Sequence, residues 1–227
     1  MKTLKMAVLA AFAALAGTGA GAATLGTIPG GGTNEALLSP VLKSVLDADD
    51  NGERAGWYGA SLYLTGLSDV KVEFLGREAS YKNTFHWDNV LFFSNALIGL
   101  NEFNNGVSGL TKTFTGVTAG LLDFAFGLNR QTATLFNGSN PDGSGASSIP
   151  NFFVSFADEN ATFGKIAYLF LDDGAAGPDD DHDDMVIRLT ASGGDITIAP
   201  VPVPAAGLLL LGGLGAIGAV ARRRKTA

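Results

Sequence analysis

The chain has 227 residues and no cysteine, and its 22 acidic residues exceed its 15 basic residues to give a net charge of −7. The lack of cysteine excludes disulfide bonds, thiol nucleophiles and thiolate metal sites. The acidic balance excludes nucleic acid as an expected partner, because phosphate would be repelled, and it favours divalent cations.

The first 22 residues have the three parts of a secretory signal peptide. Lys2 and Lys5 precede an uninterrupted apolar run over residues 6–16, and Ala20-Gly21-Ala22 follows. This last pattern of small residues suits the narrow pocket of signal peptidase. We expect that enzyme to cleave after Ala22 and the remaining chain to be exported through the inner membrane. The exported region 23–199 then holds all 22 acidic residues and only nine basic ones, a net charge of −13.

An acidic stretch early in this region resembles half of a calcium-binding loop. Residues 35–46 have helical apolar spacing, although Pro40 interrupts them, and Asp47, Asp49 and Asn51 follow with the D-x-D-x-N-G pattern of an EF-hand. The twelfth position of that loop is Tyr58 instead of the bidentate Glu. The stretch is therefore either a turn or an accessory calcium site.

The centre of the chain has the pattern of many short strands. Apolar and polar residues alternate with period two, and Gly, Asn, Asp and Pro separate the segments. In 56–66 the alternation places Tyr58, Ala60, Leu62 and Leu64 on one face. Strands are predicted at 56–66, 69–76, 89–94, 111–117, 121–128, 152–156, 165–171, 185–191 and 195–198. The predicted fold is mainly β, an antiparallel β-sandwich or jelly roll over 23–199, flanked by the signal peptide and a C-terminal transmembrane helix.

One aromatic stretch among these strands has two interpretations. His86 lies next to Trp87 and Asp88 in the sequence TFHWD. Such a patch can bind sugars by stacking on their apolar ring faces, or it can belong to the core or to a sheet edge. No nucleophile elbow, zinc HExxH or phosphate loop is present, so a non-enzymatic role is favoured over a secreted hydrolase.

Seven carboxylates lie between Asp172 and Asp184, in the loop before a predicted strand. Asp179, Asp181 and Asp183 alternate, so an extended loop would point them to one side. A hard cation such as Ca²⁺ would cancel the repulsion between them. The stretch is also consistent with a solvated acidic loop, or with Asp side chains that cap turns. The calcium hypothesis has as ligands Asp172, Asp173, Asp179, Asp181, Asp183 and Asp184.

The same stretch resembles a family of exported bacterial β-domains that end in E-D-x…D-x-D-[YF]-N-D-[LM]-V. Asp172-Asp173 match the first pair, Asp179 and Asp181 the D-x-D, and Asp184-Met185-Val186 the end of the motif. His182 replaces the aromatic residue and Asp183 replaces Asn. The resemblance implies a calcium-associated β-sandwich with an adhesive or matrix role and no known reaction.

The last 28 residues, 200–227, have the order of a sorting signal. Pro200, Pro202 and Pro204 impose an extended backbone. An uncharged apolar stretch over 205–221 follows, just long enough to span a thin bilayer, and a basic cluster closes the chain. A basic cluster is retained on the cytoplasmic side, so the rest of the chain would face outward. A simple tail anchor is the alternative, because position alone does not distinguish it from a sorting signal.

This tail resembles the PEP-CTERM class of bacterial sorting signals, in its VPLPA variant. The matching residues are Val201, Pro202, Val203, Pro204 and Ala205, followed after the span by Arg222, Arg223 and Arg224. The resemblance implies recognition by an exosortase-type transpeptidase, with transient anchoring in the inner membrane and then release to the cell surface or the extracellular space. We therefore expect a structural or adhesive matrix protein that contacts exopolysaccharide; a carbohydrate-binding module is the alternative.

Overall fold

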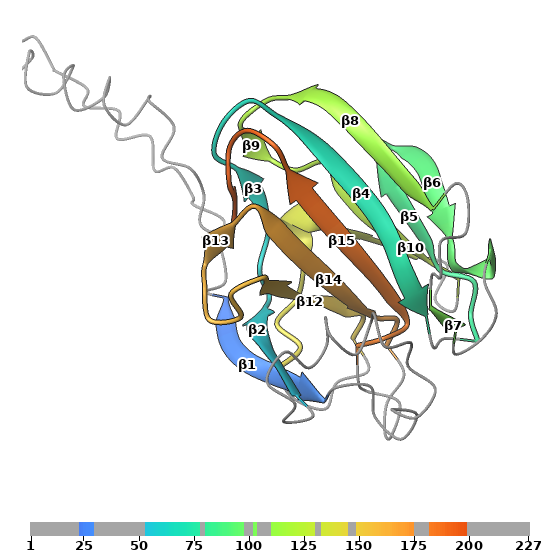
Figure 1. The fold of residues 1–227 in the computed structure, drawn as a ribbon. Helices are drawn as coiled ribbons and strands as arrows, with labels where there is room; N and C mark the ends of the chain where they lie inside the picture. Colours follow the sequence, from blue (N-terminus) through green and yellow to red (C-terminus); the bar gives the residue numbers. More distant parts are fainter. Residues whose placement is uncertain are drawn as a thin grey trace, which may run out of the picture.

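The computed structural model describes residues 23–29, 53–77, 80–97, 102–103, 110–129, 133–144, 149–174 and 182–198. The described chain is mainly β-structure in antiparallel sheets (Figure 1), which confirms that part of the prediction. Its helical residues are two 3₁₀ turns, η2 (Asn95–Leu97) and η3 (Asn137–Ser139). The predicted signal peptide, the helix at 35–46 and the span at 205–221 lie outside the described residues. Within the described ranges, no helix is long and apolar enough to cross a membrane.

The largest sheet has eight strands, and its two central strands join at the acidic stretch. Its order is β1–β2–β12–β14–β15–β4–β7, with β8 also paired to β4. Antiparallel pairing of β14 with β15 places Leu171 opposite Met185 and so fixes the two ends of the acidic stretch side by side. The strands are β1 (Thr24–Pro29), β2 (Glu53–Tyr58), β4 (Ser68–Arg77), β7 (Glu102–Phe103), β8 (Thr111–Val117), β12 (Asn151–Phe156), β14 (Ile166–Asp172) and β15 (Met185–Ala191).

Two smaller sheets complete the described fold. One has the order β11–β10–β5–β6 and lies behind the large sheet in Figure 1. The other has the order β13–β16–β3–β9 and consists of two-residue strands. Their bounds are β5 (Thr84–Trp87), β6 (Val90–Ser94), β10 (Phe124–Leu128) and β11 (Ala133–Phe136) in the first, and β3 (Tyr63–Leu64), β9 (Gly120–Leu121), β13 (Phe163–Gly164) and β16 (Ile196–Thr197) in the second.

The main core fills the space between the large sheet and the β11–β10–β5–β6 sheet. Phe126 of β10 lies with its ring centroid 5.3 Å from that of Phe85 and 5.6 Å from that of Phe152, which belongs to the large sheet. Leu169 and Ile187, at the centre of the large sheet, join the same cluster. Seven phenylalanines lie among the buried residues of this cluster, and the edge-to-face contact of Phe85 with Phe126 adds to the burial energy.

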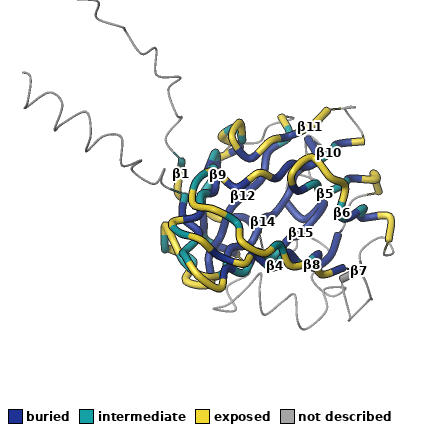
Figure 2. Tube along the Cα trace, turned by 90° about the horizontal axis from the view of Figure 1, so that it is seen from above, coloured by how far each residue is buried: buried dark blue, intermediate teal, exposed yellow. Residues whose placement is uncertain are grey.

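The large sheet is apolar on its other face as well. Successive residues of a strand point to opposite faces, so Phe152 enters the main core while Phe153 joins a second cluster with Tyr58 and Phe170. Every residue of β12 is buried. Figure 2 shows this burial running along β12, β14 and β15, with exposed residues gathered at the rim of the molecule.

The predicted strand at 56–66 is wrong as a single element. Gly59 adopts a φ of 63°, which turns the chain and separates β2 from β3. Tyr58 therefore packs in the second cluster, whereas Ala60 and Leu62 pack in the main core. The predicted strands at 111–117 and 185–191 are confirmed at the same bounds. Sequence reading missed β1, β5, β7, β11 and β13, most of which are four residues or shorter.

Truncation of a central core ring should destabilise the domain far more than truncation of a surface ring. Phe126 is fully buried, whereas Phe163 of β13 is 59% exposed. We expect Phe126→Ala to lower the free energy of unfolding by about 3–5 kcal/mol, because it removes buried surface and leaves a cavity. Phe163→Ala should change it by less than about 0.5 kcal/mol. Urea denaturation of the two variants measures the difference, and equal effects would contradict the core described above.

Candidate functional site at the acidic end of the large sheet

Four of the predicted calcium ligands belong to the described chain, and all four are buried. Asp172 ends β14 and Asp173 follows it, while Asp183 and Asp184 precede β15. Each of these side chains is at most 9% exposed. The Asp184 amide donates to the Leu171 carbonyl at 3.1 Å, so the two ends of the stretch lie together. The interpretation of a freely solvated loop is therefore wrong for these four residues.

The remaining predicted ligands lie outside the described residues. They are Asp179 and Asp181 of the acidic stretch, and Asp47, Asp49 and Asn51 of the accessory stretch. The sorting motif at 201–205 and the arginines at 222–224 also lie outside them.

Asp172 and Asp173 enter two different surroundings. The Asp172 carboxylate accepts the Gly174 amide at 2.7 Å and the Asn151 side-chain amide at 3.3 Å. Asn151 is the register partner of Asp172 across β12 and β14. The Asp173 carboxylate accepts instead from the side-chain amide of Asn83 at 2.8 Å, on the side of the smaller sheet. Two acids adjacent in sequence thus diverge, as strand alternation requires.

His182 completes the Asp172 side of the site. Its Nε2 lies 2.7 Å from the Asn151 side-chain oxygen. Because the Asn151 amide nitrogen faces the carboxylate of Asp172, that oxygen is an acceptor and Nε2 carries the proton. The imidazole lies edge-on to the rings of Tyr58 and Phe153, with centroids 5.5 and 6.3 Å away. Its Nδ1 is buried without a hydrogen-bond partner.

The electrostatics of His182 follow from this burial. Removal from water penalises the imidazolium and lowers the pKa of His182 from 6.5 to about 4. The backbone at His182 has a φ of 65°, a left-handed conformation that is uncommon outside glycine. His182 is therefore a neutral ring packed in an aromatic cluster.

The Asp173 side of the site is built from both sheets. The Asp173 amide donates to the Asp184 carboxylate at 2.6 Å. The Asn95 side-chain amide donates to the Tyr81 carbonyl at 2.8 Å and reaches the Asp184 carbonyl at 3.5 Å. Asn83 precedes β5 and Asn95 follows β6 of the smaller sheet, while Asp173 follows β14 and Asp184 precedes β15 of the large one. These contacts therefore link the ends of strands from the two sheets.

Two buried oxygens on this side have no partner. Asn83 and Asn95 are fully buried, yet the Oδ1 atom of each accepts no hydrogen bond. An unsatisfied buried polar group costs about 1–3 kcal/mol. Sequence reading missed both residues, because an isolated Asn between short strands has the same pattern as an ordinary turn residue.

The described residues contain no group of three or more His, Cys, Asp or Glu side chains placed to hold one metal ion. The Asp173 side instead combines two aspartates with two buried asparagines that contact them through their side-chain nitrogens. Carboxylate and amide oxygens are hard ligands of the type that Ca²⁺ accepts.

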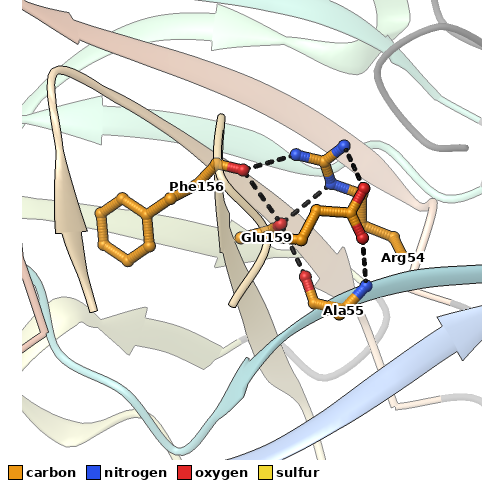
Figure 3. Close-up of polar contacts among 5 residues, drawn as sticks. Arg54, Ala55, Phe156 and Glu159 are labelled. Carbon is orange, nitrogen blue, oxygen red and sulfur yellow. Dashed lines mark hydrogen bonds and ion pairs between the residues drawn. The ribbon is translucent and has the colours of Figure 1, made fainter. Parts of the chain in front are cut away.

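A buried arginine lies on the outer face of the large sheet, at the opposite end of β12 from the Asn151–Asp172 pair. Arg54 of β2 donates to Glu159 at 3.0 Å, to the Phe156 carbonyl at 2.5 Å and to Ser155 at 2.9 Å (Figure 3). Glu159 in turn accepts the Ala55 amide at 2.8 Å. The guanidinium and the carboxylate have complementary partners, so the pair fastens β2 to the loop after β12 and is structural.

The aromatic stretch around His86 belongs largely to the core. Trp87 is 5% exposed and stacks on Phe114 at a centroid distance of 4.7 Å. Its ring is therefore not an open platform for a sugar. His86 is partly buried, and its Nε2 lies 2.9 Å from the Thr84 hydroxyl. Comparisons with protein-family models, curated proteins and solved structures gave no match to the chain.

The depressed pKa of His182 predicts a loss of stability in mild acid. The unfolded histidine takes up a proton near pH 6.5, whereas the folded one does so only near pH 4. Stability should therefore be complete above pH 6.5 and fall as the pH drops to 4, by up to about 3 kcal/mol. His182→Asn, which keeps a residue tolerant of the left-handed conformation, should remove this component.

The measurement is the free energy of unfolding from urea denaturation between pH 4 and 7.5. The wild-type and variant curves share every other ionisable group, so their difference isolates His182. His86→Asn is the matched control and should retain the wild-type pH dependence. A difference curve for His182→Asn that is flat across this range would contradict the prediction.

Proposed function

We propose that this chain is an exported, surface-sorted structural protein whose 23–199 region is a non-enzymatic β-sandwich of the jelly-roll type, stabilised by calcium. The two-sheet arrangement around a shared aromatic core supports the sandwich. Phe85 and Phe126 from one sheet meet Phe152 from the other within a single buried cluster. Inner faces that interdigitate in this way are typical of sandwich domains.

The two ends of the sequence support export and sorting. The basic, apolar and small-residue segments of 1–22 suit a signal peptidase, and 200–227 carries the proline motif, the apolar span and the arginine cluster. The proposed partners are signal peptidase and an exosortase-type transpeptidase. The inner membrane holds the C-terminal helix before processing, and exopolysaccharide is the proposed contact at the cell surface.

The single observation that carries the calcium role is the burial of four aspartates at one end of the large sheet. Asp172, Asp173, Asp183 and Asp184 are all at most 9% exposed. Like charges in a medium of low polarity repel one another strongly, and a divalent cation offsets that repulsion. Outside the cell such a cation is abundant, and the sequence offers no disulfide to stabilise the exported domain instead.

Calcium should raise the melting temperature of the full-length chain purified in detergent. A ligand that binds only the folded state at about 100 times its Kd adds about 2.7 kcal/mol. For a domain of this size that corresponds to a rise of roughly 5–10 °C. Sodium chloride at equal ionic strength controls for screening, and Mg²⁺ should give a smaller shift because it demands a stricter octahedral shell. Equal melting temperatures in EGTA and in millimolar Ca²⁺ would refute the calcium role.

Neutral residues in place of Arg222, Arg223 and Arg224 should impair sorting in a host that carries an exosortase. Without the basic cluster the C-terminal span loses the signal that retains its end in the cytoplasm. We expect unprocessed protein to accumulate, visible as a slower band on an immunoblot of cell fractions. Substitution of Lys112, a surface residue of β8, is the control. Wild-type processing of the triple variant would count against the sorting assignment.

A further inference from the structure

Asn83 and Asn95 form a side-by-side pair at the end of two strands. The register of β5 and β6 pairs Thr84 with Ser94. The Asn95 amide donates to the Asn83 carbonyl at 3.0 Å, which extends that register by one residue. Directly opposed residues of an antiparallel pair project to the same face, with Cβ atoms about 5 Å apart. The two side-chain amides therefore face the same region.

The orientation of both amides is fixed by their partners. The Asn83 Nδ2 donates to the carboxylate of Asp173, and the Asn95 Nδ2 donates to the carbonyl of Tyr81. A carboxylate and a carbonyl both accept, so a nitrogen must stand at each of these positions. The atoms left without partners are therefore oxygens, and both are fully enclosed. Each of these buried acceptors calls for a cation or a hydrogen-bond donor.

We propose that the Oδ1 atoms of Asn83 and Asn95, together with the carboxylates of Asp173 and Asp184, bind a hard divalent cation of the calcium class at the junction of the two sheets. This assignment rests on the calcium role proposed above and names its ligands. It adds two amides that the acidic motif does not contain. It also moves the site from the loop to the seam between β5–β6 and β14–β15.

The chemistry of the four ligands selects the cation. All are oxygens, of the carboxylate and amide kinds that Ca²⁺ takes at 2.3–2.6 Å. Zinc prefers nitrogen and sulfur, and His182, the histidine of this end, is engaged with Asn151 on the Asp172 side. Each carboxylate has about four lone-pair positions, which allows a carboxylate to bind a cation and accept hydrogen bonds at the same time.

A cation at this position would join the two sheets. Asn83 and Asn95 flank β5 and β6 of the smaller sheet, and Asp173 and Asp184 flank β14 and β15 of the large sheet. An ordered water molecule is the competing occupant, since it could donate one hydrogen to each amide oxygen. The two occupants differ in their response to calcium and to added charge, and the experiment uses that difference.

The test compares two variants of the full-length chain by thermal melting in EGTA and in Ca²⁺, and by Tb³⁺ luminescence with Ca²⁺ competition. Asn83→Asp keeps an oxygen at the site but places a second carboxylate beside Asp173. It should melt lower than wild type in EGTA and gain more from Ca²⁺ than wild type does. Asn95→Ala removes a ligand without adding charge, and it should weaken Ca²⁺ binding at least tenfold.

Asn137→Asp is the matched control. Asn137 is also a buried asparagine, but both its amide atoms are satisfied by the backbone of Leu62 and Leu122. It lies at the other end of the β5–β10 pair, where Trp87 is opposite Phe124. The variant should be destabilised by the buried charge equally in EGTA and in Ca²⁺, with the wild-type calcium shift retained.

The outcomes separate the two proposals. If wild type shows no calcium shift, the calcium role and this site both fail. If wild type shows the shift and both variants retain the same shift and affinity, calcium binds elsewhere on the chain and only this site is refuted. If Asn95→Ala does not fold, Asn83→Asp decides alone, because destabilisation that Ca²⁺ does not reverse assigns the position to water.

Discussion

The central strands of the large sheet are buried on both faces, and this constraint governs where the chain can place its polar groups. Every residue of β12 and six of the seven in β14 are buried. A polar side chain in such a strand must find a partner within the sheet or lie at the strand end. Arg54 and Ser155 follow the first course, and the aspartates follow the second. The position of the aspartates at the strand ends thus follows from the burial of the central strands on both faces.

Sequence patterns predicted the strands that alternate or that carry dense apolar residues. Along β4 Val70, Val72 and Phe74 are buried, while Asp69 is exposed and Lys71 and Glu73 are partly buried, so the period of two is clear. In β14 apolar and polar residues do not alternate, and its continuous run of apolar residues predicted the strand instead. β5 and β11 were missed because four residues carry too little pattern. The break at Gly59 depends on a backbone angle that the flanking alternation conceals.

The candidate site was predictable only in part, for a physical reason. The acidic run is visible in the sequence as a concentration of charge, and its burial follows from the strands on either side. The asparagines that contact Asp173 and Asp184 lie 90 and 89 residues earlier in the chain, and only sheet pairing brings them to this end. The divergence of Asp172 and Asp173 does follow from strand alternation. The same alternation places Asp172 on the side of Asn151 and His182, and Asp173 on the side of Asn83. The buried side-chain oxygens without partners, those of Asn83 and Asn95, lie on the Asp173 side.

The contacts between Asn83 and Asp173 and between Asn95 and Asp184 close one end of the two sheets with hydrogen bonds in place of aliphatic packing. Under the proposed calcium role, the free energy of that closure would depend on the ions in the surrounding water, whereas the stability of the phenylalanine core would not. On the proposed export route, a chain built in this way would remain loosely assembled in a compartment poor in calcium, where translocation requires an open chain. It would tighten on arrival outside the cell, so that the environment itself acts as the last folding factor.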